Sequence, residues 1–391
     1  MLDYTFEDYV SLIQEKQNGS NVLSNKAQIE LLQNPNFLLL YVPDDGSRMK
    51  LVKPADDSYH QKHVMEKSLI TRSSRKLSLP HYALSHLWGI SEENRHLWHE
   101  IGDYVDDEKG QPAAVVSMRP EKRETLLKLL EGHPDSYWWI DVLCARTDTP
   151  LDIMGDIYKY SRTCYAMLDC DSQCISDMQS LITQGKDPST LTVDEFWHAV
   201  DIWDKFAQCA WWKRVWTWQE MMLPKQILLI AETDTQVCNT IDMDRLYNFE
   251  EGIYWAPGDI RQAHMQWESS TSYAPVMEIK SCLRQRSELQ DQYSPHPITT
   301  IDYLTSSSRK CMKPEDYVYG VLGVFRFNLP RGIEPNKLWE LFVSRVEAIE
   351  VTSLVSANAR EFDLLTARDM ADVYQALLKS HDQVYTQYFI V

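Results

Sequence analysis

Apolar and polar positions along the middle of the chain follow the pattern of a sheet covered by helices. Short apolar runs predict strands, and segments with helical spacing lie between them. The predicted strands lie near residues 81–85, 138–143, 164–168 and 227–231. Because strands that alternate with helices form βαβ units, the pattern predicts an α/β fold with a doubly wound parallel sheet.

The segments between these strands carry helix signals. Residues 120–132 begin with proline, have acids in the first turn and end with glycine, which indicates a helix. Apolar spacing predicts a second helix around Ile153 to Tyr158 and an amphipathic helix from Phe196 to Ala210. Residues 90–117 form a polar insertion without a clear period.

The two ends of the chain differ from this middle part. Residues 4–17 and 26–33 predict short helices, and residues 37–52 predict a hairpin. Residues 54–78 are polar and read as a solvated connector, whereas the pattern beyond residue 232 is mainly helical. We therefore predict three parts, which are an N-terminal extension (1–76), an α/β domain (77–232) and a mainly helical C-terminal region (233–391).

Composition limits the classes of partner. The 391 residues include 57 acids against 39 bases, a net charge of −18, and phosphate contacts need clustered Lys and Arg, so we expect no nucleic-acid partner. No apolar run is long enough to span a bilayer and the N-terminus has no signal-peptide pattern, so we expect a cytoplasmic protein without a membrane partner. The cysteines match no zinc spacing, so we predict free thiols and no metal site.

One block is unusually rich in aromatic residues. Residues 211–220 contain four tryptophans, two cations, a glutamine and Glu220. Trp212, Trp216 and Glu220 are spaced so that one helix would place them on one stripe. The block is either a ligand site or a helix that buries its tryptophans while Glu220 pairs with Arg214 or Lys213 at the surface.

Three blocks together resemble a known family. Residues 82–89 read Tyr-Ala-Leu-Ser-His-Leu-Trp-Gly, residues 139–144 read Trp-Ile-Asp-Val-Leu-Cys, and residues 214–220 read Arg-Val-Trp-Thr-Trp-Gln-Glu. In this order, with a later block at residues 311–323, they resemble the fungal heterokaryon-incompatibility (HET) domain. HET domains are similar to TIR domains, so the resemblance implies a TIR-like, flavodoxin-like sheet with helical additions at both ends.

The resemblance also implies a chemistry. Residues 216–220 are similar to the TIR-enzyme segment whose glutamate is needed to cleave NAD at the nicotinamide–ribose bond, so Glu220 is the candidate catalytic residue. Loss of nicotinamide leaves an oxocarbenium-like ribose, and one carboxylate can oppose that positive charge. NAD or a related nucleotide is then the substrate, and no cofactor is needed.

Ligands of open α/β sheets bind outside the carboxyl ends of the strands. The candidate ligand-binding residues lie at such ends or in the tryptophan block, and they are Ser85, His86, Trp88, Gly89, Asp141, Arg146, Arg214 and Trp216. Ser85 and His86 are not a nucleophile pair, because adjacent strand residues point to opposite faces. We expect Glu220 to face an open cleft shared with residues 85–89.

Asp141 is the one charge in its predicted strand, so we expect it to be structural and paired with Arg146, Arg162 or Arg214. The loop at residues 144–154 is shorter than is usual in the family and lacks its Asn, Gln and Glu-Arg, which implies a changed specificity or a lost activity. The leading hypothesis is a HET-type effector of nonself recognition and regulated cell death that cleaves NAD through Glu220. The alternative is a catalytically inert TIR-like module or scaffold that signals by self-association or through another signalling protein.

Overall fold

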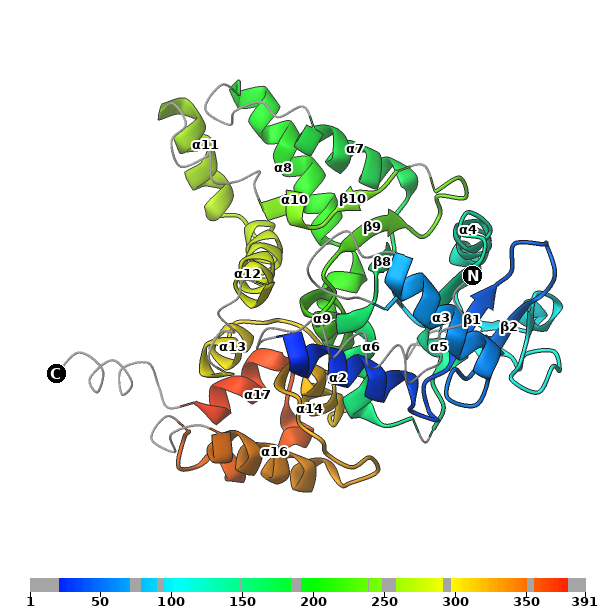
Figure 1. Cartoon of the computed structure of the whole chain (residues 1–391). Coiled ribbons are helices and arrows are strands. Elements are labelled where there is room, and N and C mark those ends of the chain that lie inside the picture. The colour runs from blue at the N-terminus through cyan, green and yellow to red at the C-terminus, as the bar shows by residue number, and fades with distance from the viewer. Residues whose placement is uncertain are drawn as a thin grey trace. The chain divides into compact units, whose positions relative to one another are not determined.

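The computed structural model describes residues 21–70, 79–89, 95–147, 149–183, 191–237, 239–247, 258–290, 297–349 and 355–378 (Figure 1). The chain divides into two compact units, Met1–Ser172 with Leu223–Thr240, and Gln173–Met222 with Ile241–Val391. This division differs from the three predicted parts, because residues 173–222 lie inside the predicted α/β domain but belong to the second unit.

The first unit is built on a sheet whose strands lie in the order β9-β8-β3-β7-β1-β2-β5. Four of them are β3 (His81–His86), β7 (Ser136–Ile140), β8 (Thr163–Leu168) and β9 (Ile227–Ala231). β3 is parallel to both β7 and β8, and β8 is parallel to β9. Numbered along the chain, these strands lie in the order 2-1-3-4, which is the order of flavodoxin-like sheets. The predicted doubly wound α/β fold is therefore confirmed.

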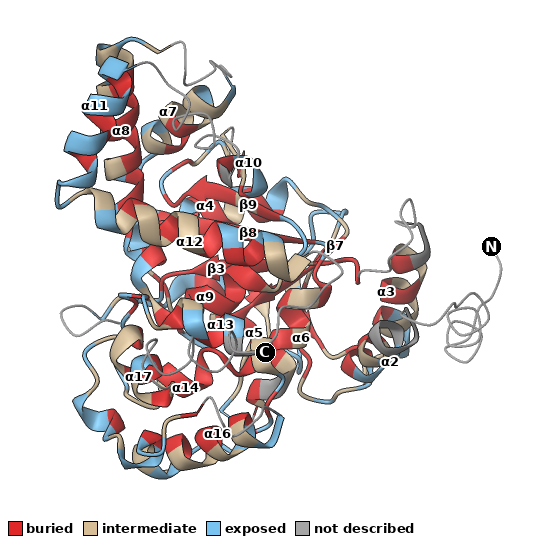
Figure 2. Ribbon diagram, turned by 90° about the vertical axis from the view of Figure 1, so that its left-hand side faces the viewer, coloured by how far each residue is buried: buried red, intermediate tan, exposed pale blue. Residues whose placement is uncertain are grey.

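The central strands are buried along their whole length. Every residue of β7 and of β8 is buried (Figure 2). Strands covered on both faces read as continuous apolar runs, which is why these segments were predictable from the sequence. The chain passes from β3 to β7 through α4 (Pro120–Glu131) and from β7 back across β3 to β8 through α6 (Leu151–Tyr160). Because such crossovers are right-handed, the two helices cover opposite faces of the sheet.

The N-terminal hairpin is part of this sheet. β1 (Leu39–Val42) and β2 (Met49–Val52) pair antiparallel, as predicted, and β1 also pairs antiparallel with β7. β5 (Val105–Asp106) adds a short parallel strand beside β2. The sheet is therefore mixed, and the hairpin continues it beyond β7.

The remaining short elements of the first unit are α2 (Asn21–Leu32), β4 (Leu97–Trp98), η1 (Glu100–Asp103) and β6 (Val116–Ser117). β4 and β6 form a separate antiparallel pair. The helix predicted at residues 4–17 lies outside the described residues.

The predicted connector at residues 54–78 is wrong for its described part, which contains the helix α3 (Ser58–Ile70). Its buried face mixes Val64 and Met65 with the polar residues His60 and Ser68. His60 Nδ1 lies 2.8 Å from the Tyr137 hydroxyl, and Ser68 Oγ donates to the Val64 carbonyl at 2.8 Å. These bonds allow polar side chains to be buried, so a hydrophobic pattern does not reveal the helix.

The second predicted strand ends earlier than expected, because Asp141 begins the short helix α5 (Asp141–Cys144). The Asp141 carboxylate accepts the backbone N–H of Val142 at 2.7 Å. A carboxylate in the first turn of a helix satisfies a free backbone donor and favours the helix start.

The second unit is mainly helical, as predicted for the C-terminal region. Its elements are α7 (Ser172–Thr183), α8 (Val193–Ala207), η3 (Ala210–Lys213), α9 (Val215–Met222), β10 (Ile241–Asp242), α10 (Asp244–Tyr247), α11 (Gly258–Glu268), α12 (Tyr273–Gln290), α13 (Pro297–Leu304), α14 (Asp316–Tyr319), α15 (Leu322–Phe325), α16 (Pro335–Ile349), η5 (Ala359–Glu361), η6 (Leu364–Thr366) and α17 (Met370–Leu377). Within the described ranges, no helix is long and apolar enough to cross a bilayer.

The tryptophan block does not form one helix. Trp212 lies in η3, and α9 begins only at Val215. Between them Arg214 is extended, the Val215 N–H donates to the Lys310 carbonyl at 3.1 Å, and the Lys310 N–H donates to the Lys213 carbonyl at 2.8 Å. This pairing with a distant segment interrupts the helix. The predicted stripe is therefore wrong for Trp212, whereas Trp216 and Glu220 both lie in α9.

Candidate functional site

Polar side chains follow the parallel strands of the first unit at one edge of the sheet. His86 ends β3, Asp141 follows β7, Asp169 comes directly after β8, and Glu232 comes directly after β9. The chain reverses direction across the sheet between β3 and β8, and such switch points are where open α/β sheets bind ligands. We call His86, Trp88, Lys122, Asp141 and Glu232 the strand-end cluster.

Asp141 is the centre of one half of this cluster. Its carboxylate lies 3.0 Å from His86 Nε2 and accepts the Trp88 indole N–H at 2.6 Å, in addition to the Val142 N–H. Burial alone would raise the pKa of the Asp141 carboxyl, but His86 and these donors lower it below its ordinary value. The carboxylate is therefore held ionised, and it fixes both side chains that follow β3.

Two of the three arginines that the sequence suggested as partners of Asp141 have other contacts. Arg146 pairs with Glu108 at 3.0 Å and donates to the Leu143 carbonyl at 2.6 Å. Arg162 lies over the ring of Tyr82, 5.7 Å from its centroid. The predicted pairing of Asp141 with an arginine is thus corrected to His86 and Trp88, whose hydrogen bonds satisfy a buried carboxylate as well as a cation would.

His86 lies between two acceptors. Its Nε2 faces Asp141, and its Nδ1 lies 3.0 Å from the Leu87 carbonyl. Burial lowers the pKa of His86 below its ordinary value, although Asp141 favours the charged ring. A proton on either ring nitrogen therefore meets an acceptor, which is the arrangement of a group that can hold and release a proton.

Lys122 and Glu232 form the other half of the cluster. Lys122, in the first turn of α4, has no exposed surface, donates to the Leu87 carbonyl and lies 3.6 Å from the Glu232 carboxylate. Arg119 pairs with Glu232 at 2.9 Å. Burial lowers the pKa of Lys122 to about 8 although Glu232 opposes the shift, and burial raises the pKa of Glu232 although Lys122 and Arg119 oppose it.

The carbonyl of Leu87 therefore contacts both halves of the cluster, because His86 and Lys122 both reach it. The sequence interpretation missed Lys122 and Glu232. Two signals were present. Glu232 follows its strand directly, as Asp141 does, and Lys122 is the one charge among the buried residues of α4.

The other candidates at this edge have different positions. Ser85 is buried and faces the side of the sheet opposite to His86, so the two do not form a nucleophile pair. A Cβ at Gly89 would lie 2.7 Å from the Met118 backbone nitrogen, so a larger residue would displace this loop. Trp88 is 43% exposed, and its indole offers a surface to solvent while its N–H is held by Asp141.

The remaining candidates lie in the second unit. Glu220 is 5% exposed, so it does not lie at the surface, as the alternative interpretation of the block required. Trp216, also in α9, is half-buried beside Asp316, and burial raises the pKa of Asp316 to about 6 although the hydrogen bond with Trp216 opposes the shift. The Arg214 carbonyl accepts Arg309 Nη1 at 2.8 Å.

Residues 85–89 and Glu220 belong to different units. The shared cleft, the catalytic role of Glu220 and the ligand-binding roles of the other candidates therefore stay predictions. Within the part of the chain that the structure describes, no group of three or more His, Cys, Asp or Glu side chains is arranged to hold a metal ion.

Comparison with known families gives one match. Residues 81–220 match the model of the heterokaryon incompatibility protein (HET) family. No curated protein and no solved structure matches the chain. The matched segment begins at β3, which carries His86, and ends at Glu220 in α9, so it includes all three sequence blocks. Residues 81–220 of this chain are therefore a heterokaryon-incompatibility (HET) domain.

Proposed function

We propose that this chain is a HET-domain effector of nonself recognition and regulated cell death, and that it acts by cleaving the glycosidic bond of NAD. The family match supports the cell-death role. The observation that supports a nucleotide substrate is the strand-end cluster, which lies at the switch point of a 2-1-3-4 sheet. The exposed part of Trp88 offers a stacking surface for adenine or nicotinamide.

In this proposal the bond between ribose C1′ and the nicotinamide nitrogen breaks, and its electron pair leaves with nicotinamide. Because the leaving group is cationic before cleavage, no general acid has to protonate it. Glu220 opposes the positive charge that develops on the ribose. Water then adds to C1′ and releases a proton, so NAD and water give ADP-ribose, nicotinamide and H⁺.

The test is incubation of the concentrated full chain with NAD, followed by quantification of nicotinamide and ADP-ribose. We expect Glu220→Gln, which keeps the shape and removes the charge, to lower turnover by roughly 10²–10³-fold, the range for removing one electrostatic stabiliser. Glu340→Gln, at an exposed position of α16, is the matched control and should leave turnover unchanged. Product release that is absent from the wild type, or equal in Glu220→Gln, would contradict the proposal.

A second candidate function is an inert interaction module. It is supported by the extent to which the strand-end carboxylates are already engaged, because Asp141 has three donors and Glu232 has two cations. Buried hydrogen-bonded groups such as Asp141 and its three donors stabilise a unique structure. Assembly that rises with protein concentration in light scattering, without NAD turnover, would favour this function.

A further inference from the structure

Trp88 is an exposed aromatic residue that is nevertheless held in place. The residue is 43% exposed, and its indole N–H donates to Asp141 Oδ2 at 2.6 Å. The carbonyl of Leu87, directly before it in the chain, accepts Lys122 Nζ and lies 3.0 Å from His86 Nδ1. Hydrogen bonds therefore fix both the side chain of Trp88 and the main chain that leads into it.

The main chain after Trp88 is fixed as well. A Cβ at Gly89 would collide with the His96 carbonyl oxygen, so the backbones at these two residues are in direct contact. The His96 N–H donates to the Gly89 carbonyl at 2.8 Å, and the Met118 N–H donates to the His96 carbonyl at 3.2 Å. A ligand that binds to the Trp88 ring therefore meets a preorganised surface.

Because Asp141 accepts the indole N–H, Trp88 offers a ligand its ring face and not its hydrogen-bond donor. A ligand must therefore bind this residue by stacking. The face of an indole is electron-rich and attracts cations. Asp141 strengthens this preference, because its carboxylate adds a negative charge beside the ring.

The charge of Asp141 is not cancelled by the groups around it. Burial alone would raise the pKa of the Asp141 carboxyl, but His86 and the other donors lower it, so the carboxylate is ionised. Burial lowers the pKa of His86 below its ordinary value of 6.5, so that ring is neutral at physiological pH. Lys122 lies 3.6 Å from Glu232, which offsets the charge of this lysine. The surroundings of Trp88 therefore favour a ring that carries a positive charge.

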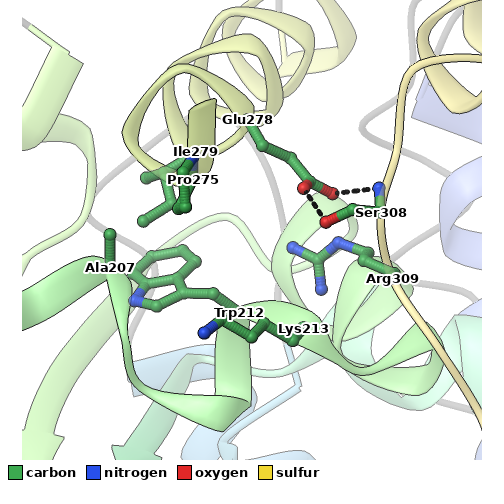
Figure 3. A pocket seen from close by; sticks show the side chains of 8 residues that line it. All are labelled: Ala207, Trp212, Lys213, Pro275, Glu278, Ile279, Ser308 and Arg309. Atoms are coloured by element: carbon green, nitrogen blue, oxygen red, sulfur yellow. Dashed lines mark hydrogen bonds between the residues drawn. The ribbon is translucent and has the colours of Figure 1, made fainter. Parts of the chain in front are cut away.

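Trp212 in the second unit provides a contrast. Figure 3 shows its ring beside Ala207, Pro275 and Ile279 in the wall of a pocket. Trp212 is only 3% exposed, and the cavity measures about 40 Å³, which is room for a few water molecules and not for an aromatic ring. A ring can therefore stack on Trp88 but not on Trp212.

We propose that Trp88 stacks on the cationic nicotinamide ring of oxidised NAD, and that Asp141 is the positioning residue that orients the indole and supplies the negative charge. The adenine ring and the reduced nicotinamide ring are neutral, so this site discriminates against both. The assignment rests on the proposed function, because it places one end of the proposed substrate. It concerns binding and not bond cleavage, so the two can be tested separately.

The test is calorimetric titration of the full chain with carba-NAD, in which carbon replaces the ring oxygen of the nicotinamide ribose, and with its reduced form. Neither ligand can form the oxocarbenium ion, and the two differ only in the hydride that neutralises the nicotinamide ring. We expect the oxidised form to bind about fivefold more tightly, the size of a cation–π contact at an exposed site. Equal binding, tighter binding of the reduced form, or no heat from either form at millimolar concentration overturns the proposal.

A charge variant separates the positioning role of Asp141 from a structural role. Asp141→Asn keeps an acceptor for the indole and removes the charge, so the ratio of the two dissociation constants should move towards one. A purely structural role would weaken both forms by the same factor, and that result overturns the role of Asp141. Glu100→Gln, which removes a negative charge at an exposed position of η1, is the matched control and should leave the ratio unchanged.

A ring variant at an exposed position tests the same site with little risk to folding. We expect Trp88→Leu to weaken the binding of carba-NAD about tenfold and to abolish the preference for the oxidised form. Tyr59→Leu, which removes an exposed ring in α3, should change neither. If Trp88→Leu bound both forms as the wild type does, the nicotinamide ring would lie elsewhere and the proposal would be wrong.

Binding and cleavage can fail independently. Cleavage of NAD by a chain that binds oxidised and reduced carba-NAD equally contradicts the role of Trp88 and Asp141 alone. A preference for oxidised carba-NAD in a chain that does not cleave NAD contradicts the proposed reaction alone.

Discussion

The two units bury charged side chains in different ways. In the first unit Lys122 lies against Glu232, and Asp141 lies against His86, so each buried charge has a titratable partner. In the second unit Arg309 is equally buried, but the acceptors that it contacts are a carbonyl, a hydroxyl and a thiol. A buried charge without a countercharge is costly. In the strand-end cluster the buried charges therefore offset one another, whereas Arg309 is buried on hydrogen bonds to neutral groups.

Breaking the strand-end cluster should have the largest effect on stability. Glu232→Leu leaves the charge of Lys122 buried without its partner, and we expect the free energy of unfolding to fall by about 3–5 kcal/mol. The double variant Lys122→Met/Glu232→Leu removes both charges and should recover most of that loss. Thermal and urea unfolding of both variants measure the difference.

The second unit provides the contrast for this experiment. Arg309→Met removes the hydrogen bonds to a carbonyl, a hydroxyl and a thiol, but it leaves no carboxylate within ion-pair distance unpaired among the described residues. We therefore expect a smaller loss of about 1–3 kcal/mol. If the Lys122→Met/Glu232→Leu double variant were no more stable than Glu232→Leu, the pair would not be coupled and the comparison would fail.

The sequence predicted the parallel strands because their signal is local. Apolar runs bounded by polar residues mark buried strands wherever the chain places them, and the predicted strand at residues 227–231 agrees with β9 at both ends. The doubly wound fold followed from the alternation with helices. The polar helix α3 was missed because its buried His60 bonds through Nδ1 to Tyr137, which is distant in sequence.

The site was predictable only in part, for the same reason. The positions of His86, Trp88 and Asp141 at strand ends were predictable, but their mutual hydrogen bonds join residues from different strands. The charge of Asp141 suggested an arginine as its partner. Only the fold shows that His86 and Trp88 form the hydrogen bonds with its carboxylate. Lys122 and Glu232 were missed because neither belongs to a recognisable motif, although each occupies a chemically unusual position.

Acidification should weaken the first unit through a buried histidine. Burial lowers the pKa of His81 to about 4 from an ordinary value of 6.5, and Nδ1 of this ring is buried without a partner. Below pH 6.5 His81 is protonated in the unfolded chain but stays neutral in the folded state. The free energy of unfolding therefore falls as the pH falls to about 4, and it is constant below that pH. The shift corresponds to roughly 3 kcal/mol at most.

The measurement is the melting temperature between pH 7 and pH 4 for the wild type, for His81→Gln and for a control, His99→Gln. His81→Gln cannot titrate and can still donate to the Ile157 carbonyl, which His81 Nε2 contacts at 2.9 Å. Its stability should therefore depend less on pH than that of the wild type. His99 is exposed, so its variant should follow the wild-type profile. An unchanged pH profile in His81→Gln would show that this histidine is not responsible.

The second unit should show a smaller effect of the opposite sign. Burial raises the pKa of Asp316 to about 6 from 3.8, and the hydrogen bond with Trp216 opposes that shift. Between about pH 4 and pH 6 the folded state keeps a proton that the unfolded chain releases, so this group costs stability as the pH rises and the cost is complete above about pH 6. Because Asp316 is only half-buried and lies in the first turn of α14, where a negative charge is favoured, we expect a net cost of about 1 kcal/mol.

Asp316→Asn keeps an acceptor for Trp216 and removes the charge. It should therefore raise the melting temperature at pH 8 by a few degrees, in line with about 1 kcal/mol, and raise it clearly less at pH 4.5, where only a part of the cost has accumulated. Glu361→Gln, at an exposed position of η5, should change the melting temperature at neither pH. A stabilisation of Asp316→Asn that is equal at pH 8 and pH 4.5 would show that the gain comes from packing, and the opposite pH responses of the two units would then have to be explained without this carboxyl.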